Sequence, residues 1–143
     1  LELLANRVFD VAGWHTELYV DARELPDLER VLTRLPRVSI DHLGMHEDGL
    51  KALLRLVEHG AMVKATGFGR VELDPASAMR AILRTNPGAL MVGTDLPSTR
   101  ARRPFAVADL ALAEEVALEL GGEQLADDVF WNNAAGLYRL AAQ

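Results

Sequence analysis

Short apolar runs alternate along the chain with longer segments of helical period. From the runs we expect four β-strands, at Thr16–Val20, Val38–His42, Met62–Thr66 and Leu90–Thr94. Each run is followed by apolar residues at the spacing of an amphipathic helix, as in Leu25, Leu28, Leu32 and Leu35. Strands that alternate with helices predict βαβ units and a parallel sheet covered by helices.

Glycine, proline and asparagine mark the predicted boundaries. Gly60 is placed to end a helix in the left-handed conformation, and Asp74-Pro75 is placed to begin one as N-cap and first residue. Asn86-Pro87-Gly88 closes that helix before the fourth strand. Asn132 or Asn133 is predicted to cap a final short helix through Leu140.

The first dozen residues do not follow the alternation. Leu1, Leu4, Val8 and Val11 form a helical stripe with no strand before it. A helix followed by four strand–helix units is what remains when a (β/α)₈ barrel of roughly 250 residues is cut near its middle. We therefore predict one α/β domain over residues 1–143, the C-terminal half of a TIM barrel. A complete small doubly wound domain is the alternative.

Half a barrel leaves two sheet edges unpaired and one face of the sheet, expected to carry Ile40, uncovered. Unpaired edges invite pairing with another chain. We therefore expect the sheet to be completed by a missing N-terminal half, by a second copy in a homo-oligomer, or by a partner protein.

Composition and charge narrow the class of protein. Half of the residues (50%) are hydrophobic and 25% are charged, as in a globular protein. The net charge of -6 argues against nucleic-acid binding, which depends on neutralising phosphates. No apolar run approaches the roughly 18 residues of a membrane span. The absence of cysteine excludes thiolate nucleophiles and fits a reducing cytoplasm.

Candidate chemistry lies where the strands end, because ligands of parallel α/β folds bind at the carboxyl ends of strands. A histidine and an aspartate that end two strands form a candidate acid–base or metal pair. If Ile40 faces the barrel interior, the alternation of side chains brings His42 to its mouth. The polar residues expected at these ends are Tyr19, Asp21, Asp41, His42, Thr66, Thr94 and Asp95.

Two charged residues within strands are expected to pair. Glu17 and Lys64 both fall on faces that point into the barrel, where an isolated charge is costly. We predict a salt bridge between them. A further basic cluster, Arg100, Arg102 and Arg103, is predicted to be either a solvated loop or a contact for an anionic substrate.

Four segments resemble one known family in their order and spacing. The family is the metal-dependent hydrolase family of amidohydrolase 2 type, within the amidohydrolase superfamily. The chain is most similar to its lactonase group, which includes 2-pyrone-4,6-dicarboxylate lactonase. The segments are Gly13-Trp14-His15, Ile40-Asp41-His42-Leu43-Gly44, Val63-Lys64-Ala65-Thr66-Gly67 and Gly93-Thr94-Asp95-Leu96-Pro97.

The resemblance implies roles for four residues. Asp95 would be the general base for the attacking water, or a metal ligand. His42 would bind metal, or polarise the scissile carbonyl in members that work without metal. Arg70 would hold a carboxylate of a small-molecule substrate, and Tyr19 would contact the substrate carbonyl or carboxylate. We expect the His42 and Asp95 side chains to lie within roughly 10 Å of each other, so that one metal ion or substrate can touch both.

The chain also departs from the family pattern. The family's first strand supplies a His-x-His pair, and this chain has none among its four histidines. Both a divalent metal such as zinc and metal-independent catalysis therefore stay open. Hydrolysis of a lactone, an amide or a related carbonyl compound is the leading function. A decarboxylase of the same barrel family and a non-catalytic half-barrel scaffold are the alternatives.

Overall fold

The computed structural model describes residues 1–140. Four parallel strands form one sheet in the order β1-β2-β3-β4, so each strand pairs with its neighbour in sequence. The strands are β1 (Thr16–Leu18), β2 (Val38–Ile40), β3 (Met62–Ala65) and β4 (Leu90–Val92). The helices are α1 (Glu2–Ala12), α2 (Leu25–Leu32), α3 (Leu50–Glu58), α4 (Pro75–Thr85), α5 (Val107–Asp127) and α6 (Asn133–Tyr138).

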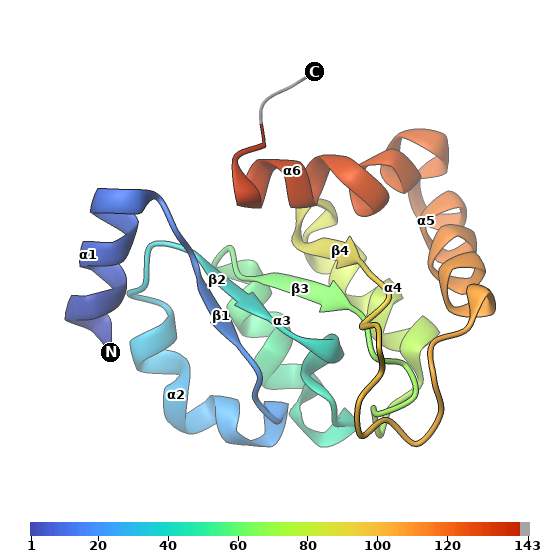
Figure 1. Ribbon diagram of the computed structural model, residues 1–143, viewed down its shortest axis with the longest axis horizontal. Coiled ribbons are helices and arrows are strands. Elements are labelled where there is room, and N and C mark those ends of the chain that lie inside the picture. The colour runs from blue at the N-terminus through green and yellow to red at the C-terminus, as the bar shows by residue number, and fades with distance from the viewer. Residues whose placement is uncertain (141–143) are drawn as a thin grey trace.

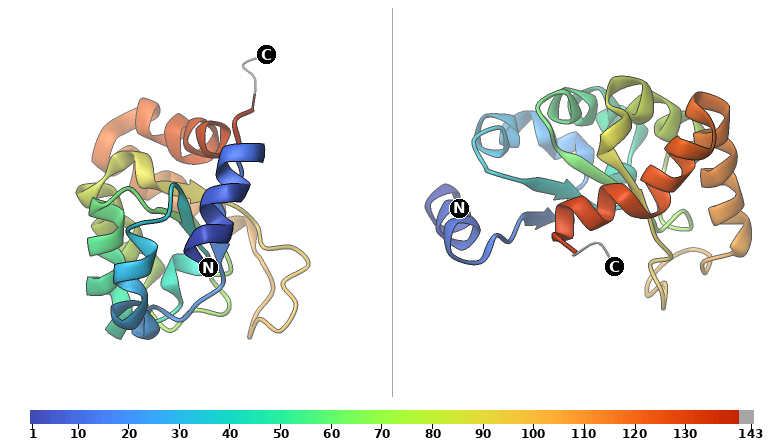
Figure 2. Two further views of the ribbon diagram at one scale, coloured as in Figure 1. Left: turned by 90° about the vertical axis from the view of Figure 1, so that its left-hand side faces the viewer. Right: turned by 90° about the horizontal axis from the view of Figure 1, so that it is seen from above.

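Helices α2, α3 and α4 cover one face of the sheet, as Figure 1 shows from the front and Figure 2 from the side and from above. The core lies between these helices and the sheet and includes Leu25, Leu53, Ile82 and Val63, each fully buried. Residues 1–140 place no such layer of helices on the opposite face, which is called the open face below. It carries Glu17 from β1 and Lys64 from β3, whose neighbours Leu18 and Val63 point to the core.

Each strand begins where the sequence predicts and ends one or two residues earlier. The expected ends at His42 and Thr94 lie outside β2 and β4. At His42 the backbone turns to φ 53°, and at Asp95, just after Thr94, it turns to φ 56°. Extended geometry cannot continue through such residues. Strands β2 and β4 are therefore shortened by the turns that carry His42 and Asp95.

The predicted face of Ile40 is wrong. Ile40 is fully buried in the core on the helix side, and Asp41 lies on the open face beside Lys64. His42 nevertheless reaches the end of the sheet, because the left-handed turn at His42 replaces the alternation of a strand.

The predicted boundary signals near Gly60 and Asp74 are confirmed. Gly60 has φ 93° directly after the α3 cap, and the Asp74 carboxylate accepts a hydrogen bond from the Ser77 amide at 2.8 Å. The predicted asparagine cap of the last helix is wrong, because a π-helical turn joins α5 to α6 without a break. Instead Asn133 Nδ2 donates to the carbonyls of Pro87 and Leu90, which ties α6 to the start of β4.

Helix α1 lies outside the layer formed by α2, α3 and α4, at the β1 side of the molecule (Figure 1). It buries Ala5, whereas Leu1, Leu4 and Val11 of its apolar stripe are exposed. Within residues 1–140, no helix is long and apolar enough to cross a membrane.

Candidate active site

The carboxyl ends of the four strands surround an open pocket of about 400 Å³. Its walls come from all four strands or from the turns that follow them. The lining residues are Glu17, Tyr19, Asp41, His42, Lys64, Thr66, Arg70 and Asp95. All four residues to which the family resemblance assigns a role are among them.

His42 is held at the floor of this pocket. Its side chain is 8% exposed, and its Nδ1 atom lies 2.8 Å from the Thr66 hydroxyl, so the two side chains share a hydrogen bond. Its Nε2 atom lies 3.9 Å from Oδ1 of Asp95. The expected proximity of His42 and Asp95 is therefore confirmed, while their chemical roles stay predictions.

Burial lowers the pKa of His42 below its usual value. Desolvation of the charged ring is the largest cause, and the positive charge of Arg70 acts in the same direction. The carboxylates of Asp95 and Asp41 oppose the shift without cancelling it. His42 is therefore a neutral imidazole at pH 7, with one ring nitrogen that donates and one that accepts.

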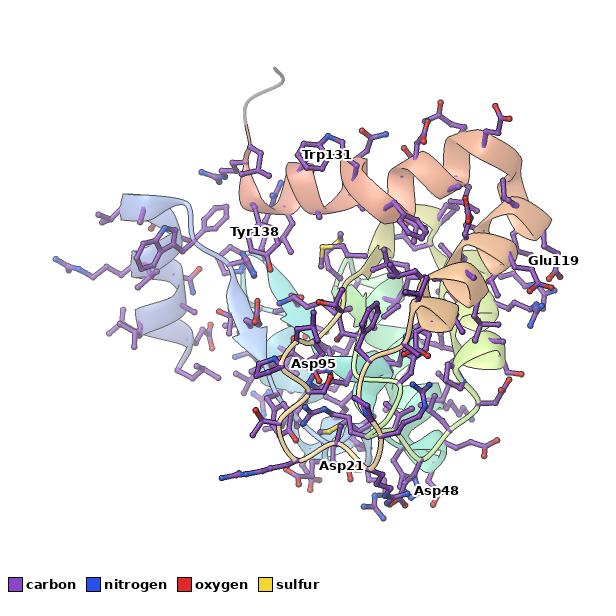
Figure 3. The ribbon with its side chains drawn as sticks, turned by 45° about the vertical axis from the view of Figure 1, so that its right-hand side comes forward. Asp21, Asp48, Asp95, Glu119, Trp131 and Tyr138 are labelled. Atoms are coloured by element: carbon purple, nitrogen blue, oxygen red, sulfur yellow. The ribbon has the colours of Figure 1, made fainter. Side chains whose placement is uncertain are left out.

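Asp95 is oriented by Arg70. The Arg70 guanidinium donates from Nε at 3.0 Å and from Nη2 at 2.6 Å, and both bonds go to the same oxygen, Oδ2 of Asp95. Nη2 also donates to the Thr99 carbonyl at 3.0 Å. The other carboxylate oxygen, Oδ1, faces His42. In Figure 3, Asp95 lies on the loop that leaves β4, at the mouth of the sheet.

The ion pair keeps Arg70 charged although its side chain is only 13% exposed. Desolvation lowers the pKa of Arg70, but the hydrogen bonds to Asp95 and Tyr19 and the charge of Asp95 outweigh it and raise the pKa overall. A substrate carboxylate at Arg70 would share the guanidinium with Asp95.

Tyr19 lies at the rim of the site. Its ring meets the His42 ring edge to face, with 5.5 Å between centroids and an interplanar angle of 82°. Tyr19 is 64% exposed, and so its hydroxyl is accessible from the pocket. This position is compatible with the substrate contact that the resemblance implies.

The backbone at His42 and Asp95 occupies the left-handed region, with φ 53° and φ 56°. Residues that carry a Cβ atom reach this region at a cost of roughly 1–2 kcal/mol. Strained residues of this kind gather at functional sites, where the surrounding structure holds them. His42 and Asp95 thus combine a predicted role with a strained backbone, and Leu43 and Met45 in the turn of His42 share the strain at φ 54° and φ 67°.

The predicted salt bridge between Glu17 and Lys64 is confirmed. Lys64 Nζ lies 2.5 Å from Oε2 of Glu17 and 3.4 Å from Oδ1 of Asp41. The Tyr138 hydroxyl donates to the same Glu17 oxygen at 3.3 Å, from the end of α6 that Figure 3 labels. The pair lies on the open face rather than in a closed interior, and the Glu17 side chain is 43% exposed.

Two residues of the site received no role from the sequence. Thr66, which fixes the His42 ring, directly follows β3 at the same edge of the sheet, and its place at the end of the predicted strand was the available signal. Gly67 has φ 61°, and a Cβ atom there would lie 2.7 Å from His42 Nδ1. Only glycine fits this turn without moving the imidazole.

Two arginines of the basic loop, Arg102 and Arg103, form ion pairs within the protein. Arg102 pairs with Glu72, and Arg103 Nη2 lies 2.6 Å from Oδ1 of Asp109 at the start of α5. Arg102 also donates its amide to the Gly69 carbonyl at 2.9 Å. These contacts fasten the segment after Asp95 to the turn that carries Arg70.

The side chains that line the pocket at the strand ends do not by themselves make a metal centre. His42 and Asp95 offer one imidazole nitrogen and one carboxylate oxygen, but a catalytic zinc site uses three protein ligands. Across residues 1–140, no three His, Cys, Asp or Glu side chains come together as a metal site. Oδ2 of Asp95, moreover, already accepts two bonds from Arg70.

Comparison with known proteins gives one family match and several structural matches for this chain. Residues 7–140 match the family model described as amidohydrolase. The solved structures that match include the apo crystal structure of ATU3138 from Agrobacterium tumefaciens, with a TM-score of 0.78, and amidohydrolase 2 from Bifidobacterium longum subsp. infantis, with 0.64. Both are 22% identical to this chain. No curated protein matches it.

The match covers nearly all of this chain and about half of the others. It includes 97% and 94% of the residues here, against 55% and 53% of the two solved chains. The chain thus spans about half the length of these structures. The predicted α/β fold, with four parallel strands alternating with helices as in half of a TIM barrel, is confirmed.

Proposed function

The chain belongs to the amidohydrolase family, and we propose that it serves a hydrolase that adds water to a lactone, an amide or a related carbonyl substrate. The observation that carries the proposal is the pairing of a neutral imidazole with a free carboxylate oxygen. Nε2 of His42 and Oδ1 of Asp95 lie 3.9 Å apart over the pocket at the strand ends.

Asp95 is the general base of the proposed reaction. Because Arg70 occupies Oδ2, Oδ1 is the oxygen available to take a proton from water. The resulting hydroxide adds to the carbonyl carbon, and the protonated Asp95 returns the proton to the leaving oxygen or nitrogen when the carbon–heteroatom bond breaks. Positioned acid–base groups of this kind contribute typically 10²–10⁴-fold in rate.

His42 stabilises the negative charge that develops on the carbonyl oxygen. In the tautomer in which the Thr66 hydroxyl donates to Nδ1, the ring proton lies on Nε2, where it can be donated into the pocket; the proposed mechanism uses this tautomer. A neutral imidazole suits this task, because it donates without giving up its proton. Tyr19 and Arg70 line the same pocket and would orient the substrate through its carbonyl or a carboxylate.

A divalent metal would need ligands from outside the described residues. His42 and Asp95 would then contribute one ligand atom each. The steps assigned above to Asp95, His42 and Arg70 do not require it.

The proposal is tested with lactones, amides and unsaturated acids as candidate substrates, in water enriched in ¹⁸O. We expect one ¹⁸O atom in the product carboxylate and a fall in kcat of about 10²-fold or more in Asp95→Asn. Asp127→Asn, an exposed substitution on α5, is the matched control and should keep wild-type activity. Release of carbon dioxide without ¹⁸O incorporation would identify a decarboxylase instead. Full activity in Asp95→Asn would overturn the assigned base.

A further inference from the structure

A lysine on the open face connects the sheet to the turn that carries His42. Lys64 comes from β3, and its side chain is 18% exposed. Desolvation opposes its charge, but hydrogen bonds to Glu17 and Tyr138 and the nearby Asp41 carboxylate raise its pKa overall. Lys64 is therefore a fixed cation at neutral pH, held between Glu17 on β1 and Asp41 at the end of β2.

Two parallel contacts join β3 to this turn. Lys64 contacts Asp41 at 3.4 Å, and Thr66, two residues further along, contacts the next residue, His42, at 2.8 Å. The sheet cannot fix His42 by its own hydrogen bonds, because β2 ends at Ile40 and the backbone turns left-handed at His42. The Asp41 backbone is held by hydrogen bonds to the Leu18 carbonyl and from the Gly44 amide, both at 3.0 Å. The Asp41 carboxylate and the His42 ring, by contrast, are held by the side chains of Lys64 in β3 and of Thr66 directly after it.

We propose that Lys64 is a positioning residue of this site, which fixes the Asp41–His42 turn and so sets the His42 ring against Asp95. The proposal rests on the proposed hydrolase function for its effect on rate, but its geometric part does not. Lys64 lines the same pocket as His42 and Asp95. Two carboxylates, Glu17 and Asp41, contact its ammonium, so we assign its action on the reaction to the turn rather than to the substrate.

A role in stability alone accounts poorly for Lys64. Half-buried ion pairs add little net stability, because the cost of desolvating both charges offsets their attraction. A methionine could cover the same area of the sheet without that cost. The pair does, however, fix a direction for Asp41, and displacement of a catalytic group by about 1 Å can cost 10²-fold in rate.

The first test observes His42 without any substrate. The carbon–proton signal of the His42 ring is assigned in a ¹H–¹³C NMR spectrum by its loss in His42→Gln. We expect Lys64→Met and Asp41→Asn each to shift or broaden that signal, whereas Lys51→Met, which changes an exposed lysine on α3, should leave it unchanged. Should Lys64→Met fail to fold, Asp41→Asn breaks the same contact. A His42 signal unchanged in Asp41→Asn and in every folded Lys64 variant would overturn the proposal.

The second test uses the hydrolase activity. Lys64→Met should lower kcat about 10-fold or more with little change in KM, and Lys64→Arg should recover most of the loss because it restores the contact with Asp41. In a double-mutant cycle, Lys64→Met with Asp41→Asn should be no slower than Lys64→Met alone. Additive losses would mean that Lys64 acts on the substrate directly and would overturn the positioning role. If no hydrolysis is found, the proposed function fails, and the NMR result still decides whether Lys64 positions His42.

Discussion

His42 combines a buried ring, which disfavours its protonated form, with a strained backbone at φ 53°. Its ring touches Thr66, Tyr19 and Asp95, and two of its neighbours are carboxylates. Desolvation nevertheless prevails and lowers its pKa. The neutral ring is therefore a property of the folded state, and it makes stability depend on pH.

The direction of that dependence follows from the lowered pKa. Below about pH 6.5, the unperturbed value, the unfolded chain binds a proton at His42 that the folded chain does not. We expect wild type to lose stability relative to His42→Asn as pH falls from 6.5 toward the lower folded pKa, and to show no such relative change above pH 7. Urea unfolding between pH 8 and pH 5 measures the difference. Parallel losses in the two proteins would contradict it.

For single residues, the sequence predicts contacts between residues in or at the ends of strands better than contacts between residues in loops. Glu17 and Lys64 were found by alternation along strands, and His42 and Asp95 by their position at strand ends. The bond between Arg70 and Asp95 could not be predicted, because it depends on how two irregular turns pack against each other. The face of Ile40 was misjudged, because the left-handed turn at His42 breaks the alternation on which the inference relied.

Among the elements, the start of α5 is fixed together with the loop that carries Asp95. Asp109 accepts the Ala106 amide at 3.0 Å and two bonds from the Arg103 guanidinium at 2.9 and 2.6 Å. The hydrogen bonds from Arg103 are the largest cause that holds the pKa of Asp109 below its usual value. One carboxylate thus caps a helix and anchors the preceding loop.

Removal of this carboxylate should destabilise the protein. We expect Asp109→Ala to lower the free energy of unfolding by roughly 1–3 kcal/mol, because the Ala106 amide and Arg103 lose a charged partner. Chemical unfolding at pH 7 measures the loss. Asp127→Asn, an exposed change near the other end of α5, should stay within about 0.5 kcal/mol of wild type. An Asp109→Ala variant as stable as this control would show that the cap contributes little.

For the whole molecule, the open edge of β1 is the feature with the largest consequence. The Thr16 amide donates to Arg37 and the Leu18 carbonyl accepts from Asp41, so these two residues face β2. By the alternation of a parallel strand, the backbone of Glu17 faces away from the sheet. The edge of β1 therefore offers a free amide and carbonyl, close to the exposed rings of Trp14 and Tyr19.

We propose that the 143-residue chain, expressed alone, associates with a second copy through the open edge of β1 in each copy. Light scattering should show a dimer or larger species that dissociates on dilution. Glu17→Pro removes the outward amide without breaking a bond to β2, and it should weaken association. Glu17→Gln loses the same carboxylate but keeps the amide, and it should associate like wild type. A monomer at all concentrations would contradict the proposal.

The number, order and starting points of the strands could be read from the sequence, because burial on the helix side imposes a strong apolar pattern. What covers the open face could not, since that face is polar and partly exposed. The apolar stripe of α1 predicts a covering neighbour, and this stays a prediction. Leu1, Leu4 and Val11 of the stripe are exposed.

At the left-handed turns of His42 and Asp95, the side chains that the proposed reaction needs are kept at the cost of backbone strain. A residue with a Cβ atom pays roughly 1 kcal/mol more than glycine for the left-handed conformation at each position. Glycine would remove that cost, but it would also remove both functional side chains. A laboratory selection that rewards only resistance to heat or protease should therefore enrich glycine at position 42. At position 95 the loss of the ion pair with Arg70 offsets the relief of the backbone, so glycine should gain less there. A selection that also demands turnover should retain histidine and aspartate at the two positions. Comparing the outcomes of the two selections would measure how much folding free energy the protein gives up to keep these groups in place.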